Sequence, residues 1–331
     1  MSCSQWDRRQ FLTRTAATFA AGFGASTALE YVLGDDETAT SAPAVKNMNP
    51  IIDTHQHLWD LSMFQLPWLK GNPTLNRSFL MSDYLKATEG LNIVKTVYME
   101  VDVEPSQQGK EAAYVLALIR KGEGPMAGAV ISGRPNSDGF QEYMTRFKDV
   151  PAIKGVRQVL HSAATPQGYA LDEWFLRGVR LLGDLDKSFD ICMRPGELGD
   201  AVKLVDACPG TRFVLDHCGN ANVRSKDRSV WRDGLAKVAE RSNVVACKVS
   251  GIVASAAPDP WTADDLAPIV NHVLDRFGPD RVVFGGDWPV CTLAATYRQW
   301  FDALTTIVSN RAAADQKKLF HDNAQRIYRL A

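Results

Sequence analysis

The feature that most constrains the fold is a regular alternation, from residue 50 onward, of short β-branched runs with longer amphipathic segments. We expect strands at residues 51–55, 93–99, 126–132, 152–157, 189–193, 212–217, 244–249 and 281–286. The amphipathic segments lie at 108–121, 138–147, 173–183, 198–207, 229–241, 263–277, 295–309 and 312–329. Such alternation favours a parallel sheet, and eight units predict an α/β fold, a (β/α)₈ TIM barrel forming a single domain over residues 50–331. An open doubly wound sheet is the alternative.

Composition and charge indicate which kinds of molecule the protein binds. The chain has 331 residues and a net charge of −1, which favours a small-molecule substrate and gives no reason to expect nucleic acid. Gly128 and Gly133 do not form a G-x-G-x-x-G loop, so we expect no nucleotide cofactor. The six cysteines include no C-x-x-C pair, and we expect buried free thiols.

The first 49 residues read as a targeting region rather than as part of the fold. Residues 7–13 (DRRQFLT) precede a mild apolar run over 15–29, with a small-residue cleavage site at 26–28. This pattern predicts a twin-arginine-type signal peptide over 1–28 and a linker over 29–49, hence the twin-arginine export machinery as a partner and a periplasmic or secreted protein. The run is too short and too weakly apolar for a stable membrane anchor. The alternative is a leader that does not function as a signal, in which case we expect a cytoplasmic protein.

The first expected strand ends in two histidines. His55 and His57 follow an apolar pair, and residues i and i+2 of a strand point to the same side. Imidazole nitrogen is a common ligand for zinc and similar ions. The pattern therefore predicts a metal or active site, with two solvated loop histidines as the alternative.

The other strands also end in polar residues. In barrel enzymes the catalytic side chains lie at the carboxyl ends of the strands. These ends carry Glu100, Arg157, Arg194, Asp216 with His217, Lys248 and Asp287, which predicts a site with an Arg/Lys-rich mouth. We expect Asp287 and His217 to be catalytic and Arg157, Lys248 and Glu100 to bind substrate. The alternatives are a helix cap at Asp287, a buried pair at His217, and structural roles for Arg157 and Lys248.

The loop after the first strand, at about 58–80, is rich in aromatic residues, including Trp59, Phe64 and Trp68. Long aromatic loops at a barrel mouth often shape a substrate pocket, and Trp59 is our candidate for a substrate contact. A small apolar lid without substrate contact is the alternative.

Five motifs together resemble the amidohydrolase superfamily, and within it the amidohydrolase-related branch. They are IIDTHQHLWD (51–60), KGVRQ (154–158), VLDHCG (214–219), KVSG (248–251) and FGGDWPV (284–290). That branch includes L-fuconolactonase, L-rhamnonolactonase and sulfomuconolactone hydrolase. The resemblance covers residues 50–331 and is a poor guide to the substrate.

The resemblance implies metal ligands at His55, His57 and Asp287, with His217 at the superfamily's sixth-strand histidine. Two positions depart from the pattern of the metal-rich members. Cys192-Met193-Arg194 stands where they have a fifth-strand histidine, and Arg157 stands where two-metal members have a modified lysine. We therefore expect at most one divalent metal, with zinc as the first candidate.

The resulting hypothesis is a hydrolase that opens the lactone of a sugar acid or of a muconate-type acid by attack of water. Asp287 would act as the general base, while His217, Arg157 and a metal would stabilise the oxyanion. The alternatives are a hydrolase of another ester or amide, a metal-dependent decarboxylase or hydratase, and an exported sugar-acid-binding protein without catalysis.

Overall fold

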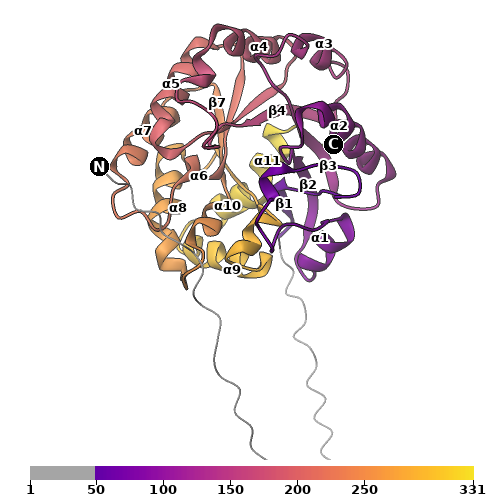
Figure 1. The fold of residues 1–331 in the computed structure, drawn as a ribbon. Coiled ribbons are helices and arrows are strands. Elements are labelled where there is room, and N and C mark those ends of the chain that lie inside the picture. Colours follow the sequence, from indigo (N-terminus) through magenta and orange to yellow (C-terminus); the bar gives the residue numbers. More distant parts are fainter. Residues whose placement is uncertain (1–48) are drawn as a thin grey trace, which may run out of the picture. The chain divides into compact units, whose positions relative to one another are not determined.

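A computed structural model describes residues 49–331 (Figure 1). The predicted signal peptide (1–28) and the predicted linker, up to residue 48, lie outside the described residues, so the export prediction stays a prediction. No helix in the described part is long and apolar enough to cross a membrane.

All eight expected strands are present and form one parallel sheet in chain order. Backbone hydrogen bonds between the end of the first strand and the segment after the last one close the sheet: Asp287 donates to His55 (2.9 Å) and His57 donates to Trp288 (2.9 Å). The fold is therefore a (β/α)₈ barrel, and the open-sheet alternative is wrong. The strands are β1 (Ile51–Gln56), β2 (Ile93–Met99), β3 (Met126–Ser132), β4 (Ile153–Val159), β5 (Ser188–Cys192), β6 (Arg212–Leu215), β7 (Val244–Val249) and β8 (Val282–Phe284).

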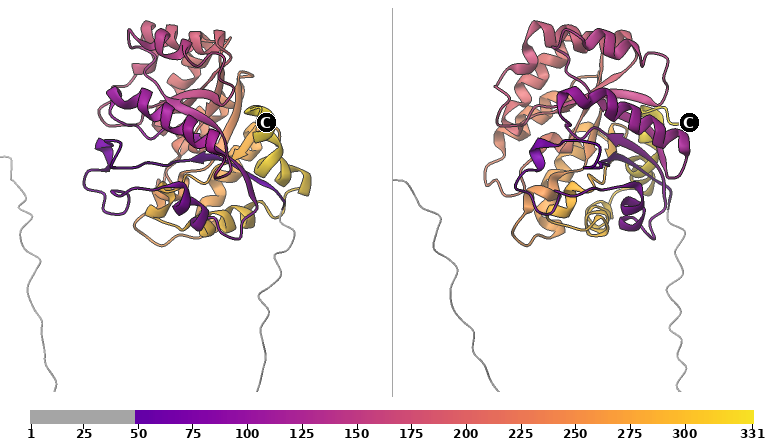
Figure 2. Two further views of the ribbon diagram at one scale, coloured as in Figure 1. Left: turned by 90° about the vertical axis from the view of Figure 1, so that its right-hand side faces the viewer. Right: turned by 45° about the vertical axis from the view of Figure 1, so that its right-hand side comes forward.

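Helices surround the strands (Figures 1 and 2). They are α1 (Met81–Ala87), α2 (Gln108–Lys121), α3 (Phe140–Thr145), α4 (Glu173–Asp184), α5 (Leu198–Ala207), α6 (His217–Asn220), α7 (Ser229–Ala239), α8 (Ala263–Phe277), α9 (Tyr297–Val308), α10 (Ala313–Lys317) and α11 (Asn323–Ile327). The expected helix over 312–329 is interrupted by a π-helical stretch, Lys318–Asp322. The sequence prediction missed α1, whose seven residues make about two turns, too short for a clear helical period.

Helix α8 illustrates how the sequence sets these elements. The Asp265 carboxylate accepts from the Thr262 backbone N–H (2.7 Å), a capping box that satisfies a free donor at the helix start. Leu266, Ile269 and Val273 recur at helical spacing and are buried. The helix ends before Gly278, whose φ of +69° suits glycine.

The interior of the barrel is apolar toward the amino ends of the strands. Inward side chains of six strands pack there against the C-terminal segment, which closes that end of the barrel. The residues are Ile52, Val97, Met99, Val130, Val214, Ala246 and Val283 from the strands, with Ala324, Ile327, Tyr328 and Leu330. In Figure 2 the loop after β1 projects at the opposite end from the C-terminus. The polar strand ends are thus left at the loop-covered mouth.

Candidate active site

His55 in β1 and His57 directly after it converge at the mouth of the barrel, with ring centres 4.8 Å apart. His57 is held by a hydrogen bond between its Nδ1 and the Met99 carbonyl oxygen (2.9 Å), which requires the hydrogen on Nδ1 and leaves the Nε2 lone pair free. Beneath them, the Asp53 carboxylate accepts from the backbone N–H groups of His55 (2.9 Å) and Gly286 (2.8 Å). Asp53 therefore fixes the β1 end against the β8 end.

Asp287 follows β8 and points at both histidines. Its Oδ1 lies 3.3 Å from His57 Nε2 and 3.7 Å from His55 Nε2. The backbone φ of Asp287, +52°, is costly for a residue with a side chain. Two residues earlier, Gly285 packs against His55, where an added Cβ would lie only 2.7 Å from His55 Cβ. The alternative role of Asp287 as a helix cap is wrong. The next short helix has Pro289 at its N-cap position, and no side chain caps it.

His217 is presented by an unusual left-handed turn after β6. His217, Cys218, Gly219 and Asn220 all have φ between +53° and +68°. The imidazole Nδ1 lies 3.0 Å from Ser250 Oγ, and the ring packs so closely on Gly251 that a Cβ there would meet Nδ1 at 2.1 Å. Burial lowers the pKa of His217 to about 4, so the ring is neutral at pH 7.

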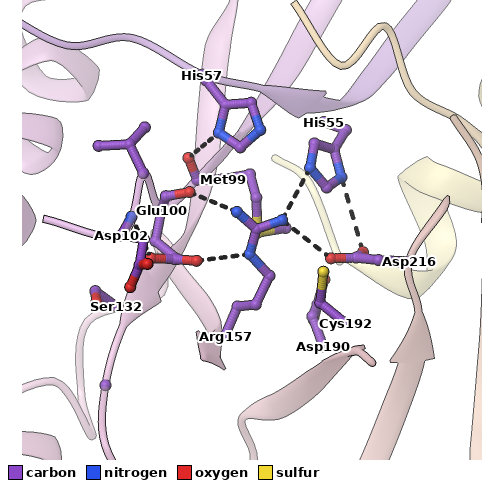
Figure 3. A network of polar contacts seen from close by, with 12 residues as sticks. His55, His57, Met99, Glu100, Asp102, Ser132, Arg157, Asp190, Cys192 and Asp216 are labelled. Atoms are coloured by element: carbon purple, nitrogen blue, oxygen red, sulfur yellow. Dashed lines mark hydrogen bonds and ion pairs between the residues drawn. The ribbon is translucent and has the colours of Figure 1, made fainter. Parts of the chain in front are cut away.

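Arg157 lies at the end of β4 between two carboxylates (Figure 3). Its Nε donates to Glu100 Oε1 (2.7 Å), and its Nη1 lies 3.3 Å from Asp216 Oδ2 and 3.1 Å from His55 Nε2. Neither Glu100 nor Asp216 is exposed. Glu100 was expected to contact substrate, and here it holds the arginine instead.

Lys248 lies deeper, and its predicted place at the mouth is wrong. The side chain is fully buried, and its Nζ lies 2.6 Å from Asp190 Oδ2 and 3.0 Å from Asp216 Oδ1. Two buried carboxylates satisfy the ammonium group, so it is not available to a substrate. The sequence prediction did not include Asp190, because a single acid in the middle of an apolar strand gives no signal of its partner.

A cavity of about 430 Å³ opens above these groups. We call it the mouth cavity. Trp68, Asp102, Arg157, His161, His217 and Asp287 are among the side chains that line it. Trp59 was expected here, but it is fully buried beneath the loop and donates through Nε1 to the Arg77 carbonyl oxygen. Trp68, whose ring lies 5.7 Å from that of Trp59, lines the cavity instead.

The mouth is poorer in free cations than the sequence suggested. Arg194 is not part of the cavity lining and pairs with Glu197 (2.6 Å). Cys192 lines the cavity where metal-rich relatives would have a histidine, and burial raises the pKa of its thiol to about 12. Its sulfur is not among the ligand atoms that lie close together with His55, His57 and Asp287.

The donor set of His55, His57 and Asp287 fits a single divalent metal. Their ligand atoms lie within 4.8 Å of one another. Donors around a tetrahedral zinc, at bond lengths of about 2.0–2.1 Å, lie roughly 3.3 Å apart, close to the distances found here. Burial holds the pKa of His55 well below its usual range, so its imidazole is neutral. Arg157 would keep Asp216 as a partner if His55 turned its lone pair to a metal.

Known proteins resemble the chain over this whole region. An L-fucono-1,5-lactonase of Burkholderia multivorans is 29% identical over 293 residues, covering 84% of this chain and 96% of its own. An L-rhamnono-gamma-lactonase of Scheffersomyces stipitis is 22% identical, covering 85% and 98%. A crystal structure of a B. multivorans amidohydrolase with bound zinc superposes with a TM-score of 0.76 at 27% identity, covering 85% of this chain and 99% of that one.

The family profile that describes amidohydrolases matches residues 52–330. This range contains all of the site residues above and all eight strands, except for the first residue of β1. The resemblance inferred from the five motifs is thus confirmed, and the chain belongs to the amidohydrolase family.

Proposed function

We propose that this protein is a lactonase that hydrolyses the cyclic ester of a sugar acid. The observation that carries the proposal is the convergence of Asp287, neutral His217 and paired Arg157 on one cavity. Relatives that span nearly the same length are named as sugar-acid lactonases, which supports the same reaction class.

The charges of the mouth cavity favour an uncharged, hydroxyl-bearing lactone over a muconate-type one. Among the described residues that line it, Arg157 is the sole permanent cation, and Glu100 and Asp216 already neutralise it. Of the two carboxylates in the lining, Asp102 is paired with Arg134 (2.8 Å) and Asp287 would balance part of the charge of a metal. A substrate with its own carboxylate would lose hydration and meet no unpaired side-chain cation among the described residues of the lining. A neutral sugar lactone can hydrogen-bond these groups and place its C–H face on Trp68.

In the proposed reaction Asp287 accepts a proton from water as the water oxygen attacks the lactone carbonyl carbon. The same carboxyl then gives this proton to the ring oxygen as the C–O bond breaks. In this mechanism the Ser250 hydroxyl, 3.0 Å from His217 Nδ1, donates to that nitrogen, so that the neutral ring carries its hydrogen on Nε2 and donates it to the carbonyl oxygen. Arg157 adds positive potential beside the developing oxyanion.

His55, His57 and Asp287 would hold the metal. A divalent ion there supplies Lewis-acid polarisation of the carbonyl oxygen. We expect protein purified without chelator and supplied with zinc to contain close to one metal ion per chain, and His57→Asn to contain far less, as measured by elemental analysis. His161→Asn, which changes a cavity histidine outside this donor set, should keep the wild-type metal content. Equal metal in all three proteins would remove the metal from the proposal.

Replacing Asp287 by asparagine tests the lactonase proposal. The amide keeps the size of the side chain and cannot take up a proton, so we expect lactone hydrolysis to fall by about a thousandfold or more with an unchanged circular dichroism spectrum. Asp102→Asn is the matched control, because Asp102 lines the same cavity but pairs with Arg134 (2.8 Å), and its rate should fall by less than about tenfold.

The assay is acid release from a panel of sugar lactones, followed with a pH indicator. Wild-type turnover that Asp287→Asn loses supports the proposal. Carbon dioxide release from carboxylated substrates would support the decarboxylase alternative, and saturable binding without turnover would support a binding protein. Lactone hydrolysis at the wild-type rate by Asp287→Asn would contradict the proposed mechanism.

A further inference from the structure

A second cavity lies at the other end of the barrel. Its volume is about 410 Å³, and it is lined where β4, β5 and β6 begin and by the C-terminal Ile327, Tyr328 and Arg329. We call it the basal cavity. Its volume falls in the range of small-molecule sites, and none of the proposed lactonase residues line it. It therefore needs an explanation of its own.

The basal cavity is rich in cations. Five basic side chains line it, against the two carboxylates of Asp149 and Asp186. The basic residues are Lys148, Lys154, Lys187, Arg212 and Arg329. The imbalance is a property of the lining, since the chain as a whole has a net charge of −1.

Two of these cations have no carboxylate partner within residues 49–331. Lys154 Nζ donates to the Arg329 carbonyl oxygen (3.1 Å). Lys187 Nζ donates to the carbonyl oxygens of Ile153 (2.9 Å) and Val150 (3.2 Å), and the residue is only 6% exposed. Carbonyl oxygens satisfy hydrogen-bond donors but do not neutralise the charge, so the cavity keeps a positive potential.

The positive charges around the basal cavity repel one another. Burial lowers the pKa of Lys154, and the charges of Lys187 and Arg329 lower it further. An anion between these groups would remove that repulsion. Arg329 and Asp186 also have φ values of +47° and +55°, backbone conformations that non-glycine residues adopt at a cost and that recur at binding sites.

We propose that the basal cavity binds a small molecule carrying two or more anionic oxygen groups, phosphates or carboxylates. Lys154 and Lys187 would contact these groups from the inner part of the basal cavity, and Arg212 and Arg329 from its solvent-facing edge. Guanidinium groups bind such oxygens through paired N–H donors, and the lysines act as point charges. A singly charged ion would leave part of the positive potential unmatched, so the site favours a multiply charged ligand.

Isothermal titration calorimetry of the complete 331-residue chain tests the proposal, with a sugar bisphosphate and inorganic phosphate as probes. We expect the bisphosphate to bind at least tenfold more tightly than phosphate. Lys154→Met should weaken bisphosphate binding about tenfold or more, because one charge-assisted contact is lost. Arg329→Gln, at an exposed rim position, should weaken it in the same direction and serves if Lys154→Met does not fold.

Two control variants locate the binding. Lys95→Met removes a lysine that donates to Gln325 Oε1 (3.0 Å) near the same end but outside the cavity lining. Trp68→Ala changes the mouth cavity. Both should bind the bisphosphate within about threefold of wild type. The proposal is overturned if neither probe binds at millimolar concentration, if phosphate binds as tightly as the bisphosphate, or if Lys154→Met and Arg329→Gln bind like wild type.

Discussion

The two cavities have nearly equal volumes, about 430 Å³ at the mouth and about 410 Å³ at the base, but they differ in how two of their lysines and arginines are paired. Beneath the mouth, each buried cation lies against carboxylates, as Arg157 and Lys248 do with their shared partner Asp216. At the base, Lys154 and Lys187 lie against backbone carbonyl oxygens. The comparison teaches that cavity size does not indicate what a site binds, whereas the pairing of its charges does.

The same contrast explains the proposed ligands. Charges that neutralise one another beneath the mouth hold side chains in place without attracting an anion, which suits a neutral lactone. Unpaired cations at the base are costly until a ligand arrives, which suits a polyanion. The proposals for both ends rest on this difference, so the following predictions test the pairing directly.

Lys248→Met should have the largest effect on stability. It leaves Asp190 and Asp216 buried beside each other with the cation between them gone, and breaking a buried pair of this kind costs about 3–5 kcal/mol. Lys154→Met removes a cation without a carboxylate partner, and its free energy of unfolding should change by less than about 1 kcal/mol. Urea unfolding of both variants measures the difference. Equal losses would show that the two ends do not differ in charge pairing.

Glu111 on α2 shows a second way in which the mouth end limits its charge. Its Oε1 accepts from Tyr98 Oη (3.0 Å) and the Val101 N–H (2.9 Å), and no cation in the described part pairs with it. Burial raises the pKa of Glu111 to about 8, and the neighbouring charge of Glu100 adds to the effect. The folded protein therefore keeps this carboxyl protonated at neutral pH.

The sign of the resulting pH dependence follows from linkage. The folded-state pKa of Glu111 lies above its ordinary value of 4.5, so its contribution to stability is complete below pH 4.5 and is lost as the pH rises toward 8. Glutamine resembles the protonated acid and cannot ionise. We expect Glu111→Gln to be more stable than wild type by about 1–3 kcal/mol at pH 8, and much less so at pH 5, in chemical denaturation. A difference that does not vary with pH would contradict the raised pKa.

The sequence predicted the barrel and the convergence at its mouth well, because both depend on periodicity and chain order. The polar residues after β1, β6 and β8 meet as expected, since the carboxyl ends of parallel strands lie at one edge. How deeply a side chain lies in the barrel was harder to predict. Lys248 ends its strand but points into the barrel, toward an aspartate on β5 that strand parity could not pair with it.

The aromatic loop gave a similar error. Trp59 and Trp68 lie in the same aromatic loop, and their sequence neighbours do not distinguish them. Only the folded loop decides which of the two residues is buried. The basal cavity was not predicted at all, because its basic residues are spread over four segments between 148 and 329 and form no motif.

Trp68 allows the smallest of these tests, on the mouth side of the comparison. The residue is 39% exposed and lines the mouth cavity, while its Nε1 donates to the Val101 carbonyl oxygen (2.8 Å). If a neutral sugar lactone lies on this ring, Trp68→Ala should raise KM by about tenfold, equivalent to about 1.4 kcal/mol, and leave kcat within about threefold. Trp174→Ala, on the outer face of α4 at 59% exposure, is the matched control and should leave both constants unchanged.

The substrate used in this test also separates the two kinds of lactone. A lactone with a free carboxylate should bind the wild-type protein poorly, because Arg157, the single permanent cation among the described residues of the mouth lining, is already paired. If such a lactone instead has the lower KM, and Trp68→Ala does not change it, then the mouth cavity recognises charge rather than an uncharged sugar face. The mouth would then resemble the base in the kind of ligand it takes, and the contrast between the two ends would no longer assign their ligands.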